Sequence, residues 1–334
     1  MQATRMFFGL TILVGSLIVV LLVAMPLAFR SGAGSRPPSP PQPIGATTRP
    51  AADTLHFSLV PERDIFAQRE RYRILARYLA AQICRPIEMV TPANYQGVLT
   101  GFANGETDGA FVGSLVAVLA HEMYGAEVVA KPELPNGIST YRGVIFVHQD
   151  SPIQTVAQLG GHSLGMVRAT TAGHLFPIDV LNDQGLLDGP HAAQMRWLGT
   201  HDDVIREVLC GHLDAGAVKD LRLEAWLADH PRDQVRRLAT SEAVPENALI
   251  VRAGMDPALR RHLQAALLRM DQTPQGRAVL AQLGAARFIP CDISQYRAVY
   301  AIARRLGPLW QRLGLNAPQP PAGVPPDVAT QPLR

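Results

Sequence analysis

Short apolar runs alternate with amphipathic helical segments along most of this 334-residue chain, and this alternation limits the folds open to it. The run at 55–61 reads LHFSLVP and ends in proline, as a strand often does. Segment 71–83 follows with a helical apolar period and a charged opposite face. The runs at 87–92 and 108–113 repeat the pattern on either side of a helical segment at 95–105. Strands that alternate with helices predict an α/β fold, with parallel sheets covered by helices on both faces.

Three later apolar runs extend the pattern. GVIFVH at 143–148, HSLGMV at 162–167 and DAGAV at 214–218 predict further buried strands. In sheets of this kind, ligands bind beyond the carboxyl ends of the strands. The residues that follow these runs are therefore the first candidates for a functional site.

The N-terminal region carries no charged residue from Met6 to Phe29. A membrane-spanning helix needs about 20 apolar residues, whereas the apolar region of a signal peptide has roughly 7 to 15. The length therefore predicts an uncleaved transmembrane anchor with the body of the chain outside. A long signal peptide cut near Ala28 is the alternative, so residues 1–30 are either an anchor or a signal segment.

Two proline-rich stretches flank the expected folded body. Residues 31–52 are rich in Pro, Gly, Ser and Thr, a composition that cannot bury a core and is typical of a semi-extended linker. Residues 317–334 have a similar composition and are predicted to be a disordered tail. The folded body is then expected between residues 53 and 316.

Composition excludes several classes of function. A hydrophobic fraction of 47% with 18% charged residues fits a globular protein with a substantial core. The formal net charge of +3, without a basic cluster, argues against nucleic-acid binding. Cys84, Cys210 and Cys291 lack metal-ligand spacing, so no metal site is expected. A disulfide between Cys84, which ends a predicted helix, and Cys291, in the C-terminal segment, is a hypothesis.

The loop after the strand at 162–167 has the features of an anion site. A helix opens around 171–173, and Thr170 and Thr171 place two hydroxyls beside small residues at its start. Free backbone N–H groups and the positive end of the helix dipole favour an anion there. The competing interpretation is that one threonine only caps the helix.

Three other polar residues lie at similar junctions. His201 follows a probable strand and precedes an amphipathic helix, Lys219 follows the apolar run at 214–218, and Ser114 precedes the helical segment 115–124. Protonated His201 would add charge to an anion site. Lys219 is either a ligand contact or a solvated lysine, and Ser114 is either a ligand donor or, slightly favoured, a helix N-cap.

The sequence lacks the motifs of the common hydrolases and nucleotide-binding enzymes. His121-Glu122 has no second histidine of a zinc-protease motif, and neither a nucleophile elbow nor a phosphate-binding lysine loop is present. His201 and Asp202 are adjacent at a helix start, so they do not face one another. We therefore expect a binding protein, without catalytic residues and without a cofactor.

Several ordered segments together resemble the phosphonate/phosphite/phosphate-type periplasmic solute-binding proteins of ABC transporters. The resemblance runs from about residue 55 to 300 and includes PIEMVTPANYQGVLTGFANGETDGAFVG, the ATTAG turn, GTHDDVIREVLCGHLDAGAVKD and TSEAVPENALIVR. Each motif alone is weak, whereas their order and spacing are specific. The family implies two α/β lobes joined by two crossing strands, a fold of the type II kind. It also implies capture of an oxyanion by hydroxyls, helix N-termini, a tyrosine and a histidine.

Carried over residue by residue, the resemblance adds one expected ligand-binding residue. It also shows positions where this sequence differs from the family pattern. The family's tyrosine corresponds to Tyr95, although Asn94 replaces the preceding aspartate, and its histidine corresponds to His201. In the family's Ser-Thr-Ser-Gly turn, two hydroxyls are kept here and the third is lost at Ala172. Val112 stands where some members carry an aromatic residue, which implies a smaller or different substituent on phosphorus.

The resemblance also implies a domain plan and a function. Lobe one comprises 53–146 and 241–316, and lobe two comprises 147–240. The expected function is capture of a phosphonate, phosphite or phosphate at the periplasmic face of the inner membrane, for delivery to an ABC permease. The alternative is a tethered sensor that reports its ligand, or another oxyanion, to a membrane receptor or kinase. The six expected ligand-binding residues are Tyr95, Ser114, Thr170, Thr171, His201 and Lys219.

Overall fold

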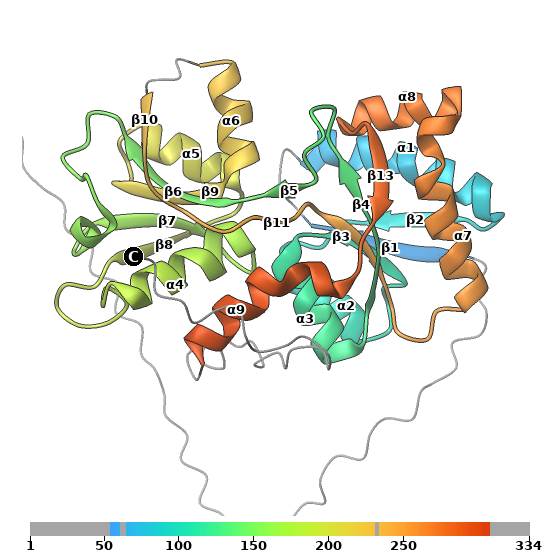
Figure 1. Cartoon of the computed structure of the whole chain (residues 1–334), viewed down its shortest axis with the longest axis horizontal. Coiled ribbons are helices and arrows are strands. Elements are labelled where there is room, and N and C mark those ends of the chain that lie inside the picture. Colours follow the sequence, from blue (N-terminus) through green and yellow to red (C-terminus); the bar gives the residue numbers. More distant parts are fainter. Residues whose placement is uncertain (1–53, 61–64, 231–233, 308–334) are drawn as a thin grey trace, which may run out of the picture. The chain divides into compact units, whose positions relative to one another are not determined.

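The structure is a computed structural model that describes residues 54–60, 65–230 and 234–307 (Figure 1). The predicted anchor, the proline-rich linker and the C-terminal tail lie outside these residues. Within the described part of the chain, no helix is both long enough and apolar enough to cross a membrane.

The first sheet has six strands in the order β13-β4-β12-β3-β1-β2. β1 pairs in parallel with β2 and with β3, whereas β12 runs antiparallel to both β3 and β4. We call the part of the chain built on this sheet lobe one. Its strands are β1 (Leu55–Leu59), β2 (Ile87–Val90), β3 (Gly109–Val112), β4 (Glu127–Glu133), β12 (Ala248–Val251) and β13 (Arg287–Pro290).

The second sheet has five strands in the order β10-β6-β9-β7-β8 and forms lobe two. β7 is parallel to β8 and β9, and β6 is antiparallel to β9 and β10. Both sheets are therefore mixed, with a parallel half and an antiparallel half. The strands are β6 (Gly143–His148), β7 (Ser163–Val167), β8 (Gln194–Leu198), β9 (Ala215–Lys219) and β10 (Val235–Thr240).

Two short strands connect the sheets. β5 (Thr140–Tyr141) and β11 (Val244–Pro245) form an antiparallel pair, with Val244 opposite Tyr141 and Pro245 opposite Thr140. Figure 1 shows both strands running between the two sheets. They are the crossing strands that the resemblance implied.

Helices cover both faces of each sheet, as the alternating pattern predicted. In β3, Ala110 and Val112 join the core that includes α2 and α3, whereas Phe111 joins the core under α1, α7 and α8. This division follows the two-residue period of a strand. The helices are α1 (Ile65–Ile83), α2 (Tyr95–Ala103), α3 (Ser114–Tyr124), α4 (Phe176–Asp183), α5 (His201–Leu209), α6 (Asp220–Ala228), α7 (Pro257–Leu268), α8 (Pro274–Leu283) and α9 (Arg297–Leu306).

Side-chain caps fix where several helices begin. The Asn94 side chain accepts a hydrogen bond from Gly97 N at 3.0 Å and starts α2. Thr200 and Asp203 form a reciprocal capping box at α5. These caps hold Tyr95 and His201 at the first positions of their helices, so helix initiation and placement of the candidate site are coupled.

The expected boundary between the lobes requires correction. β6 (Gly143–His148) pairs as a whole within the second sheet, so lobe two begins at Gly143 rather than at residue 147.

Two further expectations require correction. Ser114 is not an N-cap: Gly113 occupies that position without a side-chain hydrogen bond, and Ser114 begins the helix. The disulfide hypothesis is also wrong, because all three cysteines are free. Cys84 is exposed at the end of α1, whereas Cys291 is buried with its sulfur 3.8 Å from the Tyr296 hydroxyl.

Candidate ligand-binding site

Five of the six expected residues line one small cavity, together with Tyr141. We call this cavity the anion niche and define it by Tyr95, Tyr141, Thr170, Thr171, His201 and Lys219. Ser114 does not line it. The residues come from both sheets: Thr170 and Thr171 follow β7, Lys219 ends β9, and Tyr95 begins α2 after β2. They gather because strand carboxyl ends of both lobes meet at the crossing strands.

The two threonines play different parts. The Thr170 hydroxyl donates to Val167 O at 2.9 Å and accepts from Gly173 N at 3.0 Å, so it caps the turn. The Thr171 hydroxyl instead accepts from Leu115 N, 2.8 Å away at the start of α3. That amide belongs to lobe one and Thr171 to lobe two. Thr171 therefore occupies the position at the helix N-terminus that an anion would take.

The backbone around these threonines is unusual. Thr171–Leu175 is a π-helical turn, a rare form that occurs frequently at functional sites. Ala169, just before it, has a φ of 55°, in the left-handed region that residues other than glycine rarely adopt. Ala169 N donates to His174 Nδ1 at 3.0 Å, and this bond holds the strained residue in place.

Tyr141 is a niche residue that the sequence did not reveal. It lies on the crossing strand β5, is 4% exposed, and accepts a hydrogen bond from Ser114 N at 3.4 Å. Burial raises the pKa of the Tyr141 phenol, although the nearby Lys219 charge and a hydrogen bond with Thr171 partly oppose the rise. The phenol therefore stays neutral and keeps its proton for donation. No local pattern marks it, because its role depends on where the lobes meet.

Lys219 is buried rather than solvated, so the competing interpretation of this residue is wrong. It is 4% exposed, its Nζ pairs with the Glu246 carboxylate, and it lies 4.4 Å from the centre of the Tyr141 ring. Lys219 ends β9 in lobe two, and Glu246 precedes β12 in lobe one. The pair therefore joins the lobes and places one fixed cation in the wall of the niche.

His201 and Ser114 complete the surroundings. His201 is 2% exposed at the first turn of α5. The carboxylate of the neighbouring Asp202 pairs with the Arg222 guanidinium, with 2.5 Å between Oδ2 and Nη2. Ser114 is fully buried and donates its hydroxyl to Pro245 O at 2.8 Å. That bond fastens α3 to the crossing strand β11, which explains why Ser114 supports the niche without lining it.

The niche is almost filled by protein atoms. Its free volume is about 10 Å³, roughly the space of one water molecule. A phosphoryl group with three oxygens needs more room, so the lobes or the Thr171 side chain must move when such a group enters. The arrangement offers hydroxyl, phenol, imidazole and ammonium groups, which together suit a small oxyanion.

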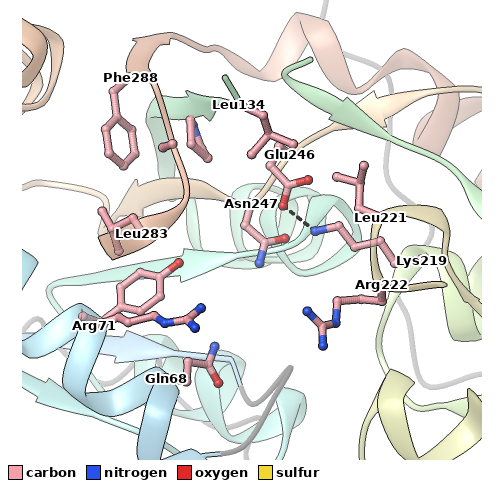
Figure 2. Close-up of a pocket in the computed structure, with 13 residues that line it drawn as sticks. Gln68, Arg71, Leu134, Lys219, Leu221, Arg222, Glu246, Asn247, Leu283 and Phe288 are labelled. Carbon is pink, nitrogen blue, oxygen red and sulfur yellow. Dashed lines mark hydrogen bonds and ion pairs between the residues drawn. The ribbon is translucent and has the colours of Figure 1, made fainter. Parts of the chain in front are cut away.

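A larger cavity adjoins the niche across Lys219. We call it the outer chamber; its volume is about 220 Å³, and its polar walls include Gln68, Arg71, Lys219, Arg222, Glu246 and Asn247 (Figure 2). Arg71 and Gln68 come from α1, Arg222 comes from α6, and Glu246 and Asn247 lie between the crossing strand and β12. Sequence reasoning missed all of these except Lys219. The only local signal is the polar pair Glu246-Asn247 directly before a fully buried strand.

Two α/β lobes, a pair of crossing strands and a polar niche between the lobes define a two-lobed solute-binding protein. The family described as ABC transporter phosphonate periplasmic substrate-binding proteins matches residues 57–296. This chain belongs to that family. It is accordingly a substrate-binding component rather than an enzyme.

Individual relatives agree with this assignment. The probable ABC transporter phosphite binding protein PhnD1 of Prochlorococcus marinus is 22% identical over 269 residues, which cover 75% of this chain and 89% of the relative. The solved structure of PhnD1 with methylphosphonate aligns with a TM-score of 0.66 at 20% identity, covering 76% of this chain and 98% of that one. A binding protein component of an ABC phosphonate transporter from Pseudomonas aeruginosa aligns with a TM-score of 0.65 at 17% identity, covering 78% and 87%. At these identities the structural likeness shows the two-lobed fold.

Proposed function

We propose that this protein captures a small phosphorus oxyanion, namely a phosphonate, phosphite or phosphate, and delivers it to an ABC importer. The observation that carries the proposal is the Thr171 hydroxyl, 2.8 Å from Leu115 N at the start of α3. An oxyanion that displaces this contact gains the helix N-terminus of one lobe and the threonine turn of the other. Family membership and the two ligands named for PhnD1 of Prochlorococcus marinus, phosphite and methylphosphonate, support the same class of ligand.

The site residues take the following roles in this proposal. Thr171 and the turn after Thr170 donate to the oxyanion through hydroxyl and backbone groups. Lys219 supplies a positive charge, and the phenols of Tyr141 and Tyr95 supply hydrogen-bond donors. His201 donates from the start of α5 and adds charge when it is protonated. Because the donors come from both lobes, the ligand binds the closed form more tightly than the open form and stabilises closure.

The test is binding to the full-length protein, measured by thermal shift and by titration calorimetry. Phosphite, phosphate, methylphosphonate, 2-aminoethylphosphonate and sulfate are compared, because a ligand that binds only the native state raises the melting temperature with concentration. We expect a shift with at least one phosphorus oxyanion. Thr171→Val and His201→Ala should each weaken it about 10- to 100-fold, since a hydrogen bond to a charged group contributes roughly 1.5–3 kcal/mol.

The matched control is Thr100→Val on α2, an exposed threonine outside the niche, which should leave binding unchanged. Failure of every phosphorus oxyanion to bind would contradict the proposed ligand class. In cells, deletion of the protein should abolish uptake of the ligand through the neighbouring permease. Unchanged uptake would contradict delivery and favour the sensing role.

We also propose that the uncharged N-terminal run tethers the protein at the periplasmic face of the inner membrane. The support is its 24 residues from Met6 to Phe29, which exceed the ~20 needed to span the hydrocarbon core. If the run is an anchor, the protein stays with the membrane pellet after alkaline carbonate washing. Release into the soluble fraction, with a shortened N-terminus, would instead identify a cleaved signal peptide.

A further inference from the structure

The outer chamber is a second, separately built cavity beside the anion niche. Lys219 lines both cavities, and its partner Glu246 and Asn247 line the chamber (Figure 2). The chamber is about twenty times larger than the free space of the niche, at roughly 220 Å³ against 10 Å³. An inorganic oxyanion held in the niche carries no substituent that could occupy this space. The chamber is therefore the place for a substituent carried on phosphorus.

The charges around the chamber do not balance. Lys219 is neutralised by Glu246 and Arg222 by Asp202. Arg71 is half-buried, lines the chamber and forms no hydrogen bond or ion pair with the described residues. Figure 2 shows the Arg71 and Arg222 guanidinium groups on opposite sides of the chamber, both directed into it. One positive charge in a partly desolvated cavity is thus left without a counter-charge from the described part of the chain.

Asn247 adds hydrogen-bonding capacity that the protein does not use. It is 7% exposed, and its Oδ1 is buried with no partner among the described residues. That oxygen lies on the niche side, 3.3 Å from where a Cβ on Gly113 would be. Figure 2 shows the amide nitrogen directed toward the side of the chamber that holds Arg71 and Gln68. Asn247 therefore offers an amide donor to the chamber, while its oxygen stays buried beside Gly113.

Size and charge together restrict the occupant. A volume of 220 Å³ lies below the ~300–1,000 Å³ of drug-sized pockets. It suits a chain of a few carbon atoms. An ammonium group would face the Arg71 guanidinium, which has no counter-charge among the described residues, whereas a carboxylate would supply that counter-charge and accept from both guanidinium and amide.

We propose that the preferred ligand is a phosphonocarboxylate, with the phosphoryl group in the niche and the carboxylate on Arg71 and Asn247 in the outer chamber. This rests on the proposed function, because it assumes that the niche takes the phosphoryl group. Arg71 is then the residue that determines specificity for the substituent. Its planar guanidinium can bind a carboxylate in bidentate fashion, which a lysine cannot.

The test compares four probes on the full-length protein by titration calorimetry. 3-Phosphonopropionate and phosphonoacetate carry the carboxylate, methylphosphonate lacks it, and 2-aminoethylphosphonate carries an ammonium group in its place. We expect one of the two phosphonocarboxylates to bind at least tenfold more tightly than methylphosphonate. We expect 2-aminoethylphosphonate to bind more weakly than either phosphonocarboxylate. Arg71→Gln should reduce the ratio of the dissociation constant of methylphosphonate to that of the tighter carboxylate to about one. Arg71→Lys should keep part of this preference and lose the rest.

The control is Arg77→Gln, which changes an exposed arginine on the same helix outside the chamber and should leave the ratio unchanged. If methylphosphonate binds but the carboxylate brings no gain, the chamber assignment is overturned while the proposed function stands. The same holds if the gain survives in Arg71→Gln protein with a normal melting temperature. If none of the four probes binds while phosphite or phosphate does, this inference fails and the proposed function stands. If phosphite and phosphate also fail to bind, the proposed function fails, and this inference fails with it.

Discussion

At the scale of single residues, the ion pair between Lys219 and Glu246 is the feature most open to measurement. The two side chains are 5% and 11% exposed, so each charge depends on the other for compensation. Removing one partner of a buried pair costs about 3–5 kcal/mol, because the remaining charge is left buried. We expect Lys219→Met to lower the free energy of unfolding by an amount in this range, measured by urea unfolding without ligand.

A double variant separates the charge from the packing. Lys219→Met combined with Glu246→Leu removes both charges, and replacing a buried pair by apolar residues is often neutral. The double variant should therefore recover most of the lost stability. A single variant as stable as the parent protein would mean that the pair is not formed in solution.

Lys219 and Ser114 also show what a residue's sequence position leaves open. Lys219 was expected at the end of a strand, and it lies there, but its burial depends on Glu246 and Tyr141 from distant segments. Ser114 stands one position after the true cap, because Gly113 takes the extended conformation that precedes α3. A one-residue shift converts a capping hydroxyl into one that reaches Pro245. The local sequence pattern predicts that each residue lies at a junction between a strand and a helix. The function of its side chain depends on contacts with residues that are distant in the sequence.

At the scale of elements, the turn that carries Thr171 depends on a neutral histidine. His174 Nδ1 accepts the hydrogen bond from Ala169 N, and the ring packs edge-on against Trp197 with centroids 4.8 Å apart. Burial, aided by the charge of Arg168, lowers the pKa of His174 from 6.5 to about 4. Protonation would remove the acceptor that holds Ala169 in its left-handed conformation. The turn therefore requires the uncharged imidazole.

This shift predicts a pH dependence of stability. Between pH 6.5 and about 4 the unfolded chain binds a proton at His174 that the folded chain does not, so stability falls as pH decreases through this window. The full effect is on the order of 3 kcal/mol, because each pKa unit corresponds to about 1.36 kcal/mol. Urea unfolding at pH 7, 5.5 and 4.5 measures it.

His174→Asn is the informative comparison, because its amide oxygen can accept from Ala169 N without titrating. The variant should lose less stability than the parent protein on acidification over the same range, since the carboxylates elsewhere are shared by both. Identical pH profiles for the two proteins would contradict a lowered pKa at His174. Stability at pH 7 serves as the measure of any packing lost against Trp197.

The elements differ in how far the sequence predicts them. β1, β2 and β3 fall within the expected runs because their apolar residues are contiguous and bounded by turns. Helix α1 begins at Ile65, six residues before the expected start at Arg71, since its first turns lack the apolar period that marks the rest. The sequence predicts an ordinary helix start at 171–173, whereas the structure has a π-helical turn there. The outer chamber escaped sequence reasoning because its polar walls come from distant segments, namely α1, α6 and the segment before β12.

At the scale of the whole folded unit, the two lobes are already joined across the niche. The Leu115–Thr171 hydrogen bond and the Lys219–Glu246 pair both cross from one lobe to the other. With only about 10 Å³ free in the niche, a ligand cannot enter this arrangement directly. The crossing strands β5 and β11 are the natural hinge, because they are the short paired link between the sheets. We therefore expect the lobes to open before the ligand binds.

This order of events predicts the form of the binding kinetics. When opening comes first, the observed rate of association stops rising at high ligand concentration and reaches the rate of opening. Hinge motions occur in microseconds to milliseconds, so a plateau on the order of 10³ s⁻¹ or faster is expected. Rapid mixing at low temperature with methylphosphonate or phosphate, followed by the fluorescence of Trp197 beside the threonine turn, measures it.

Thr171→Val provides the decisive comparison, because it acts on opening and on affinity in opposite directions. Loss of the hydroxyl removes the bond to Leu115 N that holds the empty lobes together, so the plateau rate should rise. The same loss removes a donor to the bound oxyanion, so the equilibrium affinity should fall. A rate that increases linearly with ligand concentration into the millimolar range, in parent and variant alike, would show that the empty protein rests with its lobes apart. In that case the contact between Thr171 and Leu115 would form only when the lobes close after binding. The ligand would then enter an open niche, and the Thr171 side chain would not have to leave it first.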